Sequence, residues 1–220
     1  MSGSKRKVIA GLQVSLDGFT QGSDQDGPEW VDSWADALDL IPDVDTFVQG
    51  AGMYPGYALY WSAIEADPNA VAPYSTRKPY ERDIAYAQRA AKTPHYVLST
   101  TLDGVEWPPT ARIVRDLDAI RALKEQSGGN IYAVGGPTFV ASLLNAGLLD
   151  ELLLLVHPLL LGSGKSLFEN LNDLRRLKLT RCEPTTDGRA LLVYLTDAES
   201  ISTPESKNER HEIHDYVGSR

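Results

Sequence analysis

The hydrophobic residues of this chain gather in short, nearly continuous runs that end in glycine, proline or hydroxyl residues. Such runs lie at residues 7–19, 44–52, 94–101, 130–136 and 150–162. They are rich in residues that suit strands, and they lack the alternation of polar and apolar positions seen in a half-exposed strand. This pattern predicts strands that are buried on both faces of a sheet.

Amphipathic segments separate these runs. Apolar residues near helical spacing predict helices at residues 28–41, 79–92, 114–130 and 137–149, of which all but the third begin with proline. Residues 20–30 are predicted to be loop, and residues 54–79 are predicted to be irregular before the next helix begins. Two further segments, 175–184 and 190–198, predict an antiparallel pair of strands around a turn.

Strands that alternate with helices and are followed by a run of strands predict the α/β class. We expect a mostly parallel central sheet with an antiparallel C-terminal edge, in a single domain over residues 1–199. From about residue 200 the chain becomes polar and loses periodicity. Residues 200–220 are therefore predicted to be a tail that is mobile or docked on a partner.

Charge and composition narrow the class of protein. The net charge of −9 argues against binding nucleic acid or an anionic membrane through the whole surface. The longest apolar stretch is interrupted by charged residues and proline, so we expect no membrane span. A single cysteine, Cys182, permits no internal disulfide. With no apolar signal core near residue 1, a cytoplasmic protein is expected.

The segment LLLGSGKSLF, residues 159–168, contains the Gly-Lys-Ser of a triphosphate-binding loop. That motif needs a glycine five positions before its second glycine, and Leu159 stands there. His157 and Pro158 also interrupt the preceding strand, and no helix clearly follows. We interpret the segment as a Gly-rich turn between strands.

A different phosphate site is indicated where the run at residues 130–136 ends. Gly135 and Gly136 permit close backbone approach, and Pro137 fixes the first helical turn, to which Thr138 adds a hydroxyl. The N–H groups at the start of a helix bind anions. A plain tight turn between strand and helix is the alternative.

Two other strand ends have similar chemistry. Gly50 and Gly52 close one run, and another closes with Ser99, Thr100 and Thr101. Ligands of open α/β sheets bind outside the carboxyl ends of the strands. These ends together predict an elongated ligand, such as a dinucleotide, that crosses the sheet.

The order of these motifs resembles the dihydrofolate reductase-like superfamily, and more closely the reductase domain of the bifunctional riboflavin-biosynthesis deaminase/reductase and its stand-alone bacterial relatives. The resemblance runs from about Val8 to Leu195. It includes Ser-Leu-Asp-Gly at residues 15–18, IYAVGGPTFVASLLNAGLLDEL at residues 131–152, and PLLLGSGKSLF at residues 158–168.

The resemblance implies a three-layer dihydrofolate reductase-like fold and a reductase in which NADPH delivers hydride to a small heterocyclic or sugar-derived substrate; NADH is not excluded. It implies that Gly135, Gly136, Pro137 and Thr138 hold the pyrophosphate and that Ser99, Thr100 and Thr101 face the adenosine ribose and its 2′-phosphate. Val14 and Ser15 would lie near the nicotinamide.

One departure from the family pattern follows Gly50. Many relatives have an arginine at the next position that reaches a cofactor phosphate, and here Ala51 stands in its place. The segment at residues 98–104 also offers no lysine or arginine for the 2′-phosphate. Arg77, Lys78 and Lys92 are candidates to compensate.

Candidate substrate residues follow from the same resemblance and from composition. Asp17 is the candidate catalytic residue, as a substrate contact or proton relay, although Asp-Gly is also a common turn dipeptide. Aromatic residues can line a flat substrate pocket or fill the core. The aromatic candidates are Trp30, Trp34, Tyr54, Tyr57 and Trp61.

The histidines of the sequence do not predict a metal site. His157 precedes a proline and is interpreted as structural, and His211 and His214 lack a third ligand in the sequence. No zinc signature of a deaminase is present, which excludes a bifunctional enzyme.

Three functional hypotheses remain. The first is an NAD(P)H-dependent reductase of a small molecule, with a homodimer as its expected assembly. The second is a ligand-binding or assembly protein of the same fold with a degenerate cofactor site, which Ala51 motivates. A pterin-reducing enzyme of the dihydrofolate type is the third.

Overall fold

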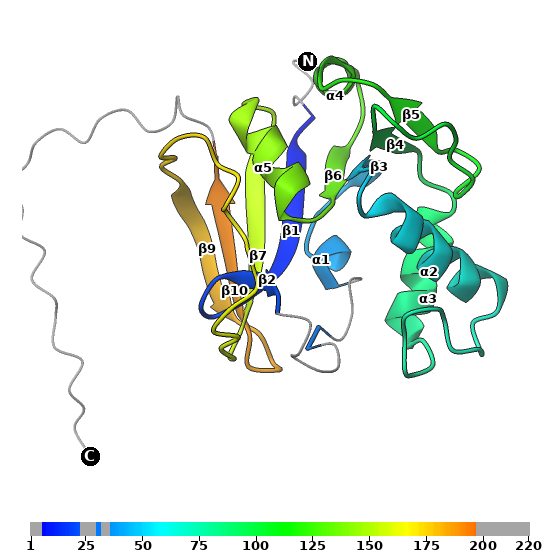
Figure 1. Ribbon diagram of the computed structural model, residues 1–220, viewed down its shortest axis with the longest axis horizontal. Helices are drawn as coiled ribbons and strands as arrows, with labels where there is room; N and C mark the ends of the chain where they lie inside the picture. The colour runs from blue at the N-terminus through cyan, green and yellow to red at the C-terminus, as the bar shows by residue number, and fades with distance from the viewer. Residues whose placement is uncertain (1–5, 23–29, 32–35, 197–220) are drawn as a thin grey trace, which may run out of the picture.

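The central sheet of the computed structural model has eight strands within the described residues 6–22, 30–31 and 36–196 (Figure 1). Their order across the sheet is β5-β4-β3-β6-β1-β7-β10-β9. The strands are β1 (Val8–Ser15), β3 (Val44–Gly50), β4 (His95–Leu98), β5 (Arg112–Val114), β6 (Asn130–Val134), β7 (Glu151–His157), β9 (Lys178–Pro184) and β10 (Ala190–Leu195).

The strand directions confirm the predicted fold class. β1 runs parallel to β6 and β7, β3 runs parallel to β4 and β6, and β4 runs parallel to β5. β10 is antiparallel to both β7 and β9, and β9 forms the C-terminal edge. The carboxyl ends of β6, β3 and β4, which are neighbours, therefore lie at one edge of the sheet.

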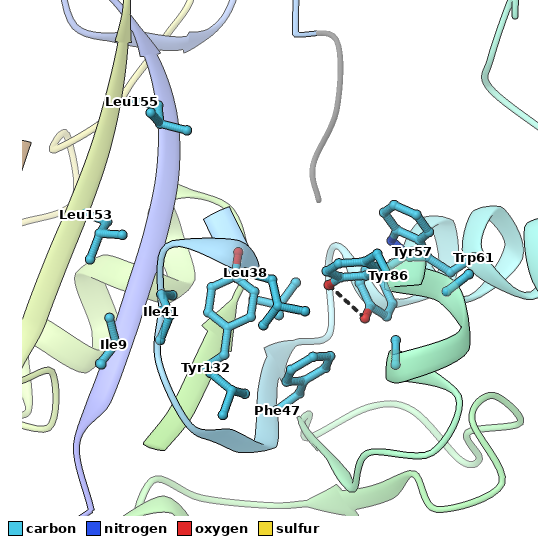
Figure 2. Close-up of a cluster of buried hydrophobic side chains, with 14 of the residues drawn as sticks. Ile9, Leu38, Ile41, Phe47, Tyr57, Trp61, Tyr86, Tyr132, Leu153 and Leu155 are labelled. Carbon is cyan, nitrogen blue, oxygen red and sulfur yellow. Dashed lines mark hydrogen bonds between the residues drawn. The ribbon is translucent and has the colours of Figure 1, made fainter. Parts of the chain in front are cut away.

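Helices cover both faces of the sheet and make three layers. α1 (Asp36–Asp39), α2 (Tyr54–Ala66) and α3 (Glu81–Ala90) lie against one face, and α4 (Asp118–Lys124) and α5 (Pro137–Asn145) against the other. Alternating side chains of one strand join opposite cores, as Phe47 and Val48 do. The core on the α2–α3 face is rich in aromatic residues (Figure 2).

The helix predictions were partly wrong. The irregular segment predicted from residue 54 instead begins with α2, whose buried side chains Tyr54, Tyr57, Trp61 and Ile64 have helical spacing. The helix predicted over residues 28–41 is described only as the four residues of α1, and Trp30 and Val31 lie outside any helix. The helix predicted from residue 114 begins at Asp118, because β5 takes up Val114.

Three short strands were not predicted: β5 in the central sheet, and β2 (Phe19–Gln21) and β8 (Lys165–Ser166) outside it. β2 pairs antiparallel with β8 in a separate two-stranded sheet. β2 falls partly in the predicted loop, and β8 falls in the Gly-rich turn. Every residue of β9 is exposed, because β9 is the edge of the sheet.

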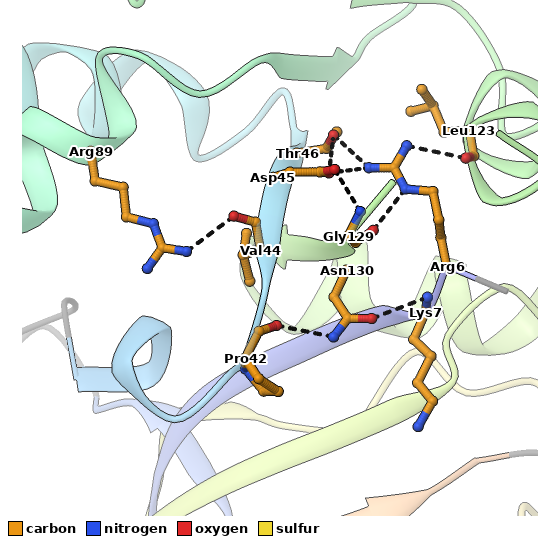
Figure 3. Close-up of polar contacts among 10 residues, drawn as sticks. All are labelled: Arg6, Lys7, Pro42, Val44, Asp45, Thr46, Arg89, Leu123, Gly129 and Asn130. Atoms are coloured by element: carbon orange, nitrogen blue, oxygen red, sulfur yellow. Dashed lines mark hydrogen bonds and ion pairs between the residues drawn. The ribbon is translucent and has the colours of Figure 1, made fainter. Parts of the chain in front are cut away.

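The amino ends of the strands are joined by a buried arginine (Figure 3). Arg6, just before β1, donates hydrogen bonds to the carbonyl of Gly129 at 2.7 Å and to the hydroxyl of Thr46 at 2.7 Å, and it pairs with Asp45. A buried charge is tolerated when it is paired and hydrogen-bonded, as here. This network fixes β1, β3 and β6 at the edge opposite to their carboxyl ends.

Candidate functional site

A cavity of about 600 Å³ lies at the carboxyl edge of the sheet. It is within the size range of cofactor and small-molecule sites. Its walls are the ends of β3 and β6, the start of α5, part of β1 and the β2–β8 sheet. The lining residues are Leu12, Gln13, Thr20, Gln21, Val31, Gly50, Ala51, Gly52, Met53, Gly135, Gly136, Pro137, Thr138, Phe139, Ser142 and Lys165.

The start of α5 offers one free amide to this cavity, that of Thr138. Gly136 is the residue that precedes the helix, and no side chain caps the helix start in the described structure. Pro137 carries no N–H, and the N–H groups of Phe139 and Val140 donate to the carbonyl of Gly136. The backbone N–H of Thr138 has no such acceptor in the described residues, so it is available to an anion.

The glycines at these strand ends have two different functions. A Cβ at Gly50 or Gly135 would lie 2.9 or 2.6 Å from the side chain of Phe139, so these two glycines let β3 and β6 pack under α5. A Cβ at Gly136 would meet nothing within 4 Å. Gly136 therefore leaves open the space that a ligand would use.

The hydroxyl residues after β4 lie next to the cavity but do not line it. The N–H of Ala51 donates to the carbonyl of Leu98 at 3.1 Å, which joins the ends of β3 and β4. Ser99 is buried, and its hydroxyl accepts hydrogen bonds from the N–H groups of Thr101 at 3.1 Å and Leu102 at 2.9 Å. Ser99 therefore holds the turn, whereas Thr100 and Thr101 are exposed on it.

An arginine that the sequence did not indicate lies on this turn. Arg115 follows β5, and its Nη1 donates to the carbonyls of Ser99 at 3.0 Å and Leu102 at 2.9 Å. The side chains suggested as compensating cations are placed elsewhere. Lys92 precedes β4 and so lies at the opposite edge of the sheet, and Arg77 pairs with Asp83 at 2.9 Å. Neither Arg77 nor Lys78 lines the cavity.

The residues at the end of β1 lie outside the cavity lining. Val14 belongs to the core on the α4–α5 face. Ser15 is buried, and its hydroxyl donates to Asp17 at 2.6 Å while accepting from the N–H of Phe19 at 3.0 Å. Of the β1 side chains, Leu12 and Gln13 line the cavity instead.

Asp17 holds the Gly-rich turn. Its carboxylate accepts hydrogen bonds from the N–H groups of Gly162 at 2.7 Å and Leu161 at 3.2 Å. The hydrogen bond from Ser15, followed by that from Gly162, lowers the pKa of Asp17 below its ordinary value. The carboxylate is thus ionised at neutral pH and accepts hydrogen bonds, which favours a positioning role over that of a general acid.

The tyrosines predicted to contact substrate lie in the core. The hydroxyl of Tyr54 donates to the carbonyl of Trp107 at 2.9 Å and accepts from the N–H groups of Glu106 and Trp107. The hydroxyl of Tyr57 lies 3.1 Å from both Tyr86 and His95. Neither tyrosine lines the cavity, so this placement does not support their predicted contact with substrate.

Of the other aromatic and histidine candidates, one lies in the core, three lie outside the described residues, and His157 contacts a residue of the cavity wall. Trp61 is a core residue, and Trp34 lies outside the described residues, as do His211 and His214. His157 is buried, with Nε2 2.7 Å from the side-chain oxygen of Gln13 and the ring of Trp30 set edge-on against it. His157 thus orients a side chain that lines the cavity.

Lys165 is the other functional candidate that the sequence reasoning missed. It belonged to the Gly-Lys-Ser that was interpreted only as a turn, yet β8 brings it into the lining of the cavity. The signal that could have found it is in this segment of the chain, where a lysine directly follows the pair Gly162 and Gly164. The described residues contain no group of three or more side chains able to hold a metal ion.

Comparison with known proteins identifies the family. The family described as "RibD C-terminal domain" matches residues 6–191. The chain belongs to this family. The resemblance drawn from the sequence motifs is thereby confirmed.

Individual proteins similar to this chain agree with this assignment. Uncharacterized protein YyaP of Bacillus subtilis (strain 168) is 27% identical over 194 residues, which cover 86% of this chain and 95% of that protein. A putative riboflavin biosynthesis protein from Shewanella sp. PV-4 superposes with a TM-score of 0.58 at 21% identity, over 86% of this chain and 98% of that chain.

The fold extends to the dihydrofolate reductases. The enzyme from Enterococcus faecalis, whose structure contains NADP(H) and RAB-propyl, superposes with a TM-score of 0.54 at 13% identity, over 86% of this chain and 95% of that chain. At these identities the solved structures establish a shared fold. Among the described helices, none has the length and apolar character needed to cross a bilayer.

Proposed function

We propose that this protein is an NAD(P)H-dependent reductase that transfers hydride to a small heterocyclic or sugar-derived molecule. The observation that carries the proposal is the cavity, into which the ends of β3 and β6 bring Gly50, Ala51 and Gly136 beside Thr138. Membership of the RibD C-terminal domain family and the fold shared with an NADP(H)-binding dihydrofolate reductase support it.

The chain's own residues fit a dinucleotide. The free amide and the hydroxyl of Thr138 suit a pyrophosphate, and Gly136 leaves room for it. The turn at residues 99–102 follows β4, which lies two strands from β6 along the same edge of the sheet. This position suits the adenosine end of the dinucleotide. The cofactor, when bound, supplies the hydride. The protein binds the dinucleotide, orients it beside the substrate and limits the access of water.

Direct binding tests this proposal. NADPH should quench the tryptophan fluorescence and raise the thermal midpoint, with a dissociation constant in the micromolar range typical of enzyme ligands. A panel of small heterocycles and sugar derivatives, assayed by loss of the reduced nicotinamide absorbance, would then identify the substrate. The proposal fails when neither NADPH nor NADH changes the fluorescence or the midpoint.

Ala51 favours a second candidate, a binding or assembly protein that keeps the fold without redox chemistry. The lost arginine contact would weaken phosphate binding about ten- to a hundredfold. An Ala51→Arg variant separates the two candidates. It should tighten an existing affinity for NADPH under the reductase proposal, whereas binding that appears only in the variant would favour the second candidate.

A further inference from the structure

Lys165 is the only residue with a formal charge among the described residues that line the cavity. The rest of that lining is apolar, amide, hydroxyl or glycine, with no carboxylate. The protein as a whole carries a net charge of −9. A cavity that holds a lone cation in so acidic a protein is biased toward an anionic ligand.

The ammonium of Lys165 is available to such a ligand. Lys165 is exposed, and no carboxylate pairs with it within the described part of the chain. Its backbone carbonyl is engaged, because it accepts a hydrogen bond from the hydroxyl of Thr20 at 3.2 Å. The backbone of Lys165 is thus fixed while its side chain is not committed to an ion pair.

The position of Lys165 is built into the turn that precedes it. Lys165 pairs with Gln21 across the β2–β8 sheet. Gly164 has a φ of +138°, and a Cβ there would lie only 2.0 Å from the carbonyl oxygen of Gln21. Only glycine permits this close approach. The carboxylate of Asp17 holds the same turn at Gly162.

The site faces the place where a family cation is missing. Ala51 and Lys165 line the same cavity but come from different walls, the end of β3 and the β2–β8 sheet. The start of α5, with Gly136 and Thr138, forms a third wall. An anion in this cavity is therefore offered the amide of Thr138 and the ammonium of Lys165, and it does not require an arginine at position 51.

We propose that Lys165 supplies the positive charge that binds the pyrophosphate of the dinucleotide, in place of the arginine absent at position 51. This inference rests on the proposed function and deepens it. Lys165 is a binding residue here, and no step of hydride transfer is assigned to it.

The test is a titration of NADPH, NADH and ADP-ribose, with tryptophan fluorescence and calorimetry as readouts. Lys165→Met should weaken all three about ten- to a hundredfold, because each contains the pyrophosphate and loses one charge-assisted contact. Lys165→Arg should retain most of the affinity. Lys178→Met is the matched control, since Lys178 is an exposed lysine on β9 outside the cavity, and it should leave all three affinities unchanged.

A second variant tests the compensation. Ala51→Arg combined with Lys165→Met should recover most of the lost affinity, and the two changes should be non-additive because both cations serve one anion. Increasing salt should weaken binding to the wild type more steeply than binding to Lys165→Met, since one fewer ionic contact is screened.

The outcomes separate this inference from the proposed function. Wild-type protein that binds none of the three ligands overturns both. Wild-type protein that binds them, with Lys165→Met binding equally well, overturns the inference alone. A loss confined to NADPH would move Lys165 to the 2′-phosphate and so would also overturn the assignment to the pyrophosphate.

Discussion

Asp17 accepts a hydrogen bond of 2.7 Å from the backbone N–H of Gly162. This contact joins the loop after β1 to the turn before β8, two segments far apart in the sequence. Hydrogen bonds from Ser15 and from the turn lower the pKa of Asp17, so the contact is charge-assisted at neutral pH. Because the same turn leads directly to Lys165, the carboxylate acts on the cavity without lining it.

Replacement of Asp17 by asparagine should weaken NADPH binding by a few-fold to about tenfold, because the amide cannot accept every bond that the carboxylate accepts. In a Lys165→Met background the same replacement should have little further effect on affinity. Fluorescence titration of the single and double variants measures this coupling. An unchanged affinity accompanied by a fall in kcat would instead identify Asp17 as a proton relay.

Gly136→Val should block the dinucleotide while the fold is retained. The φ of Gly136 is −74°, which any residue adopts, and the added side chain would enter open space. We expect more than about a tenfold loss of NADPH affinity, the scale of a lost phosphate contact, with little change in the thermal midpoint.

Gly56→Val is the control for that change. Gly56 lies in α2, outside the cavity lining, and a Cβ there also meets nothing within 4 Å. The affinity of the Gly56→Val variant for NADPH should equal that of the wild-type protein. Equal affinities for the two valine variants would show that Gly136 does not border the bound cofactor.

Arg115→Gln should reduce selectivity for NADPH over NADH. Both hydrogen bonds of Arg115 to the Ser99–Leu102 turn come from Nη1, which leaves Nε and Nη2 for the 2′-phosphate. We expect about a tenfold loss of NADPH affinity with unchanged NADH affinity. Parallel titrations with the two nucleotides measure the ratio, and an equal loss for both would contradict a contact specific to the 2′-phosphate.

His95 should make the protein less stable in mild acid. Burial lowers the pKa of His95 from 6.5 to about 4. Between these values the unfolded chain binds a proton that the folded chain does not, so stability is complete above about pH 6.5 and falls as the pH approaches 4. A shift of one pKa unit corresponds to about 1.4 kcal/mol, so the free energy of unfolding should fall by up to about 3 kcal/mol.

Urea unfolding at pH 7 and pH 5 measures this loss. The His95 Nδ1–H donates to the carbonyl of Thr93 at 2.8 Å, so Nε2 accepts from the Tyr57 hydroxyl at 3.1 Å. His95→Gln keeps a neutral acceptor for that hydroxyl and removes the titration. The variant should be less stable at pH 7 but should depend less on pH, and equal pH dependence in both proteins would exclude His95 as the cause.

Much of the fold was predictable because its main strands are mostly buried. β3, β4, β6 and β7 lie in largely apolar runs closed by glycine, hydroxyl or His-Pro residues, and these signals are local. α2 was missed because Pro55 and Gly56 near its start suggested a loop, although Tyr54, Tyr57, Trp61 and Ile64 already had helical spacing. β5 has only three residues, too few to show a period.

The site was less predictable than the fold, because part of it depends on pairing between strands that are distant in the sequence. Gly135, Gly136 and Thr138 follow one another in the chain, so their contribution was visible in the sequence. Lys165 reaches the cavity only through pairing with β2, and Arg115 reaches the turn at Ser99 only through pairing of β5 with β4. Such long-range neighbours leave no local pattern. The sequence could not place Tyr54 and Tyr57, because an aromatic residue suits a core as well as a pocket.

The two-residue strand β8 carries Lys165 and Ser166 next to each other, and successive side chains of a strand point to opposite faces. Inserting or deleting one residue between Gly162 and Lys165 would therefore rotate the ammonium away and present a neutral neighbour instead. Among homologues that lack the arginine at position 51, the length of this short turn should thus be as restricted as the identity of the lysine.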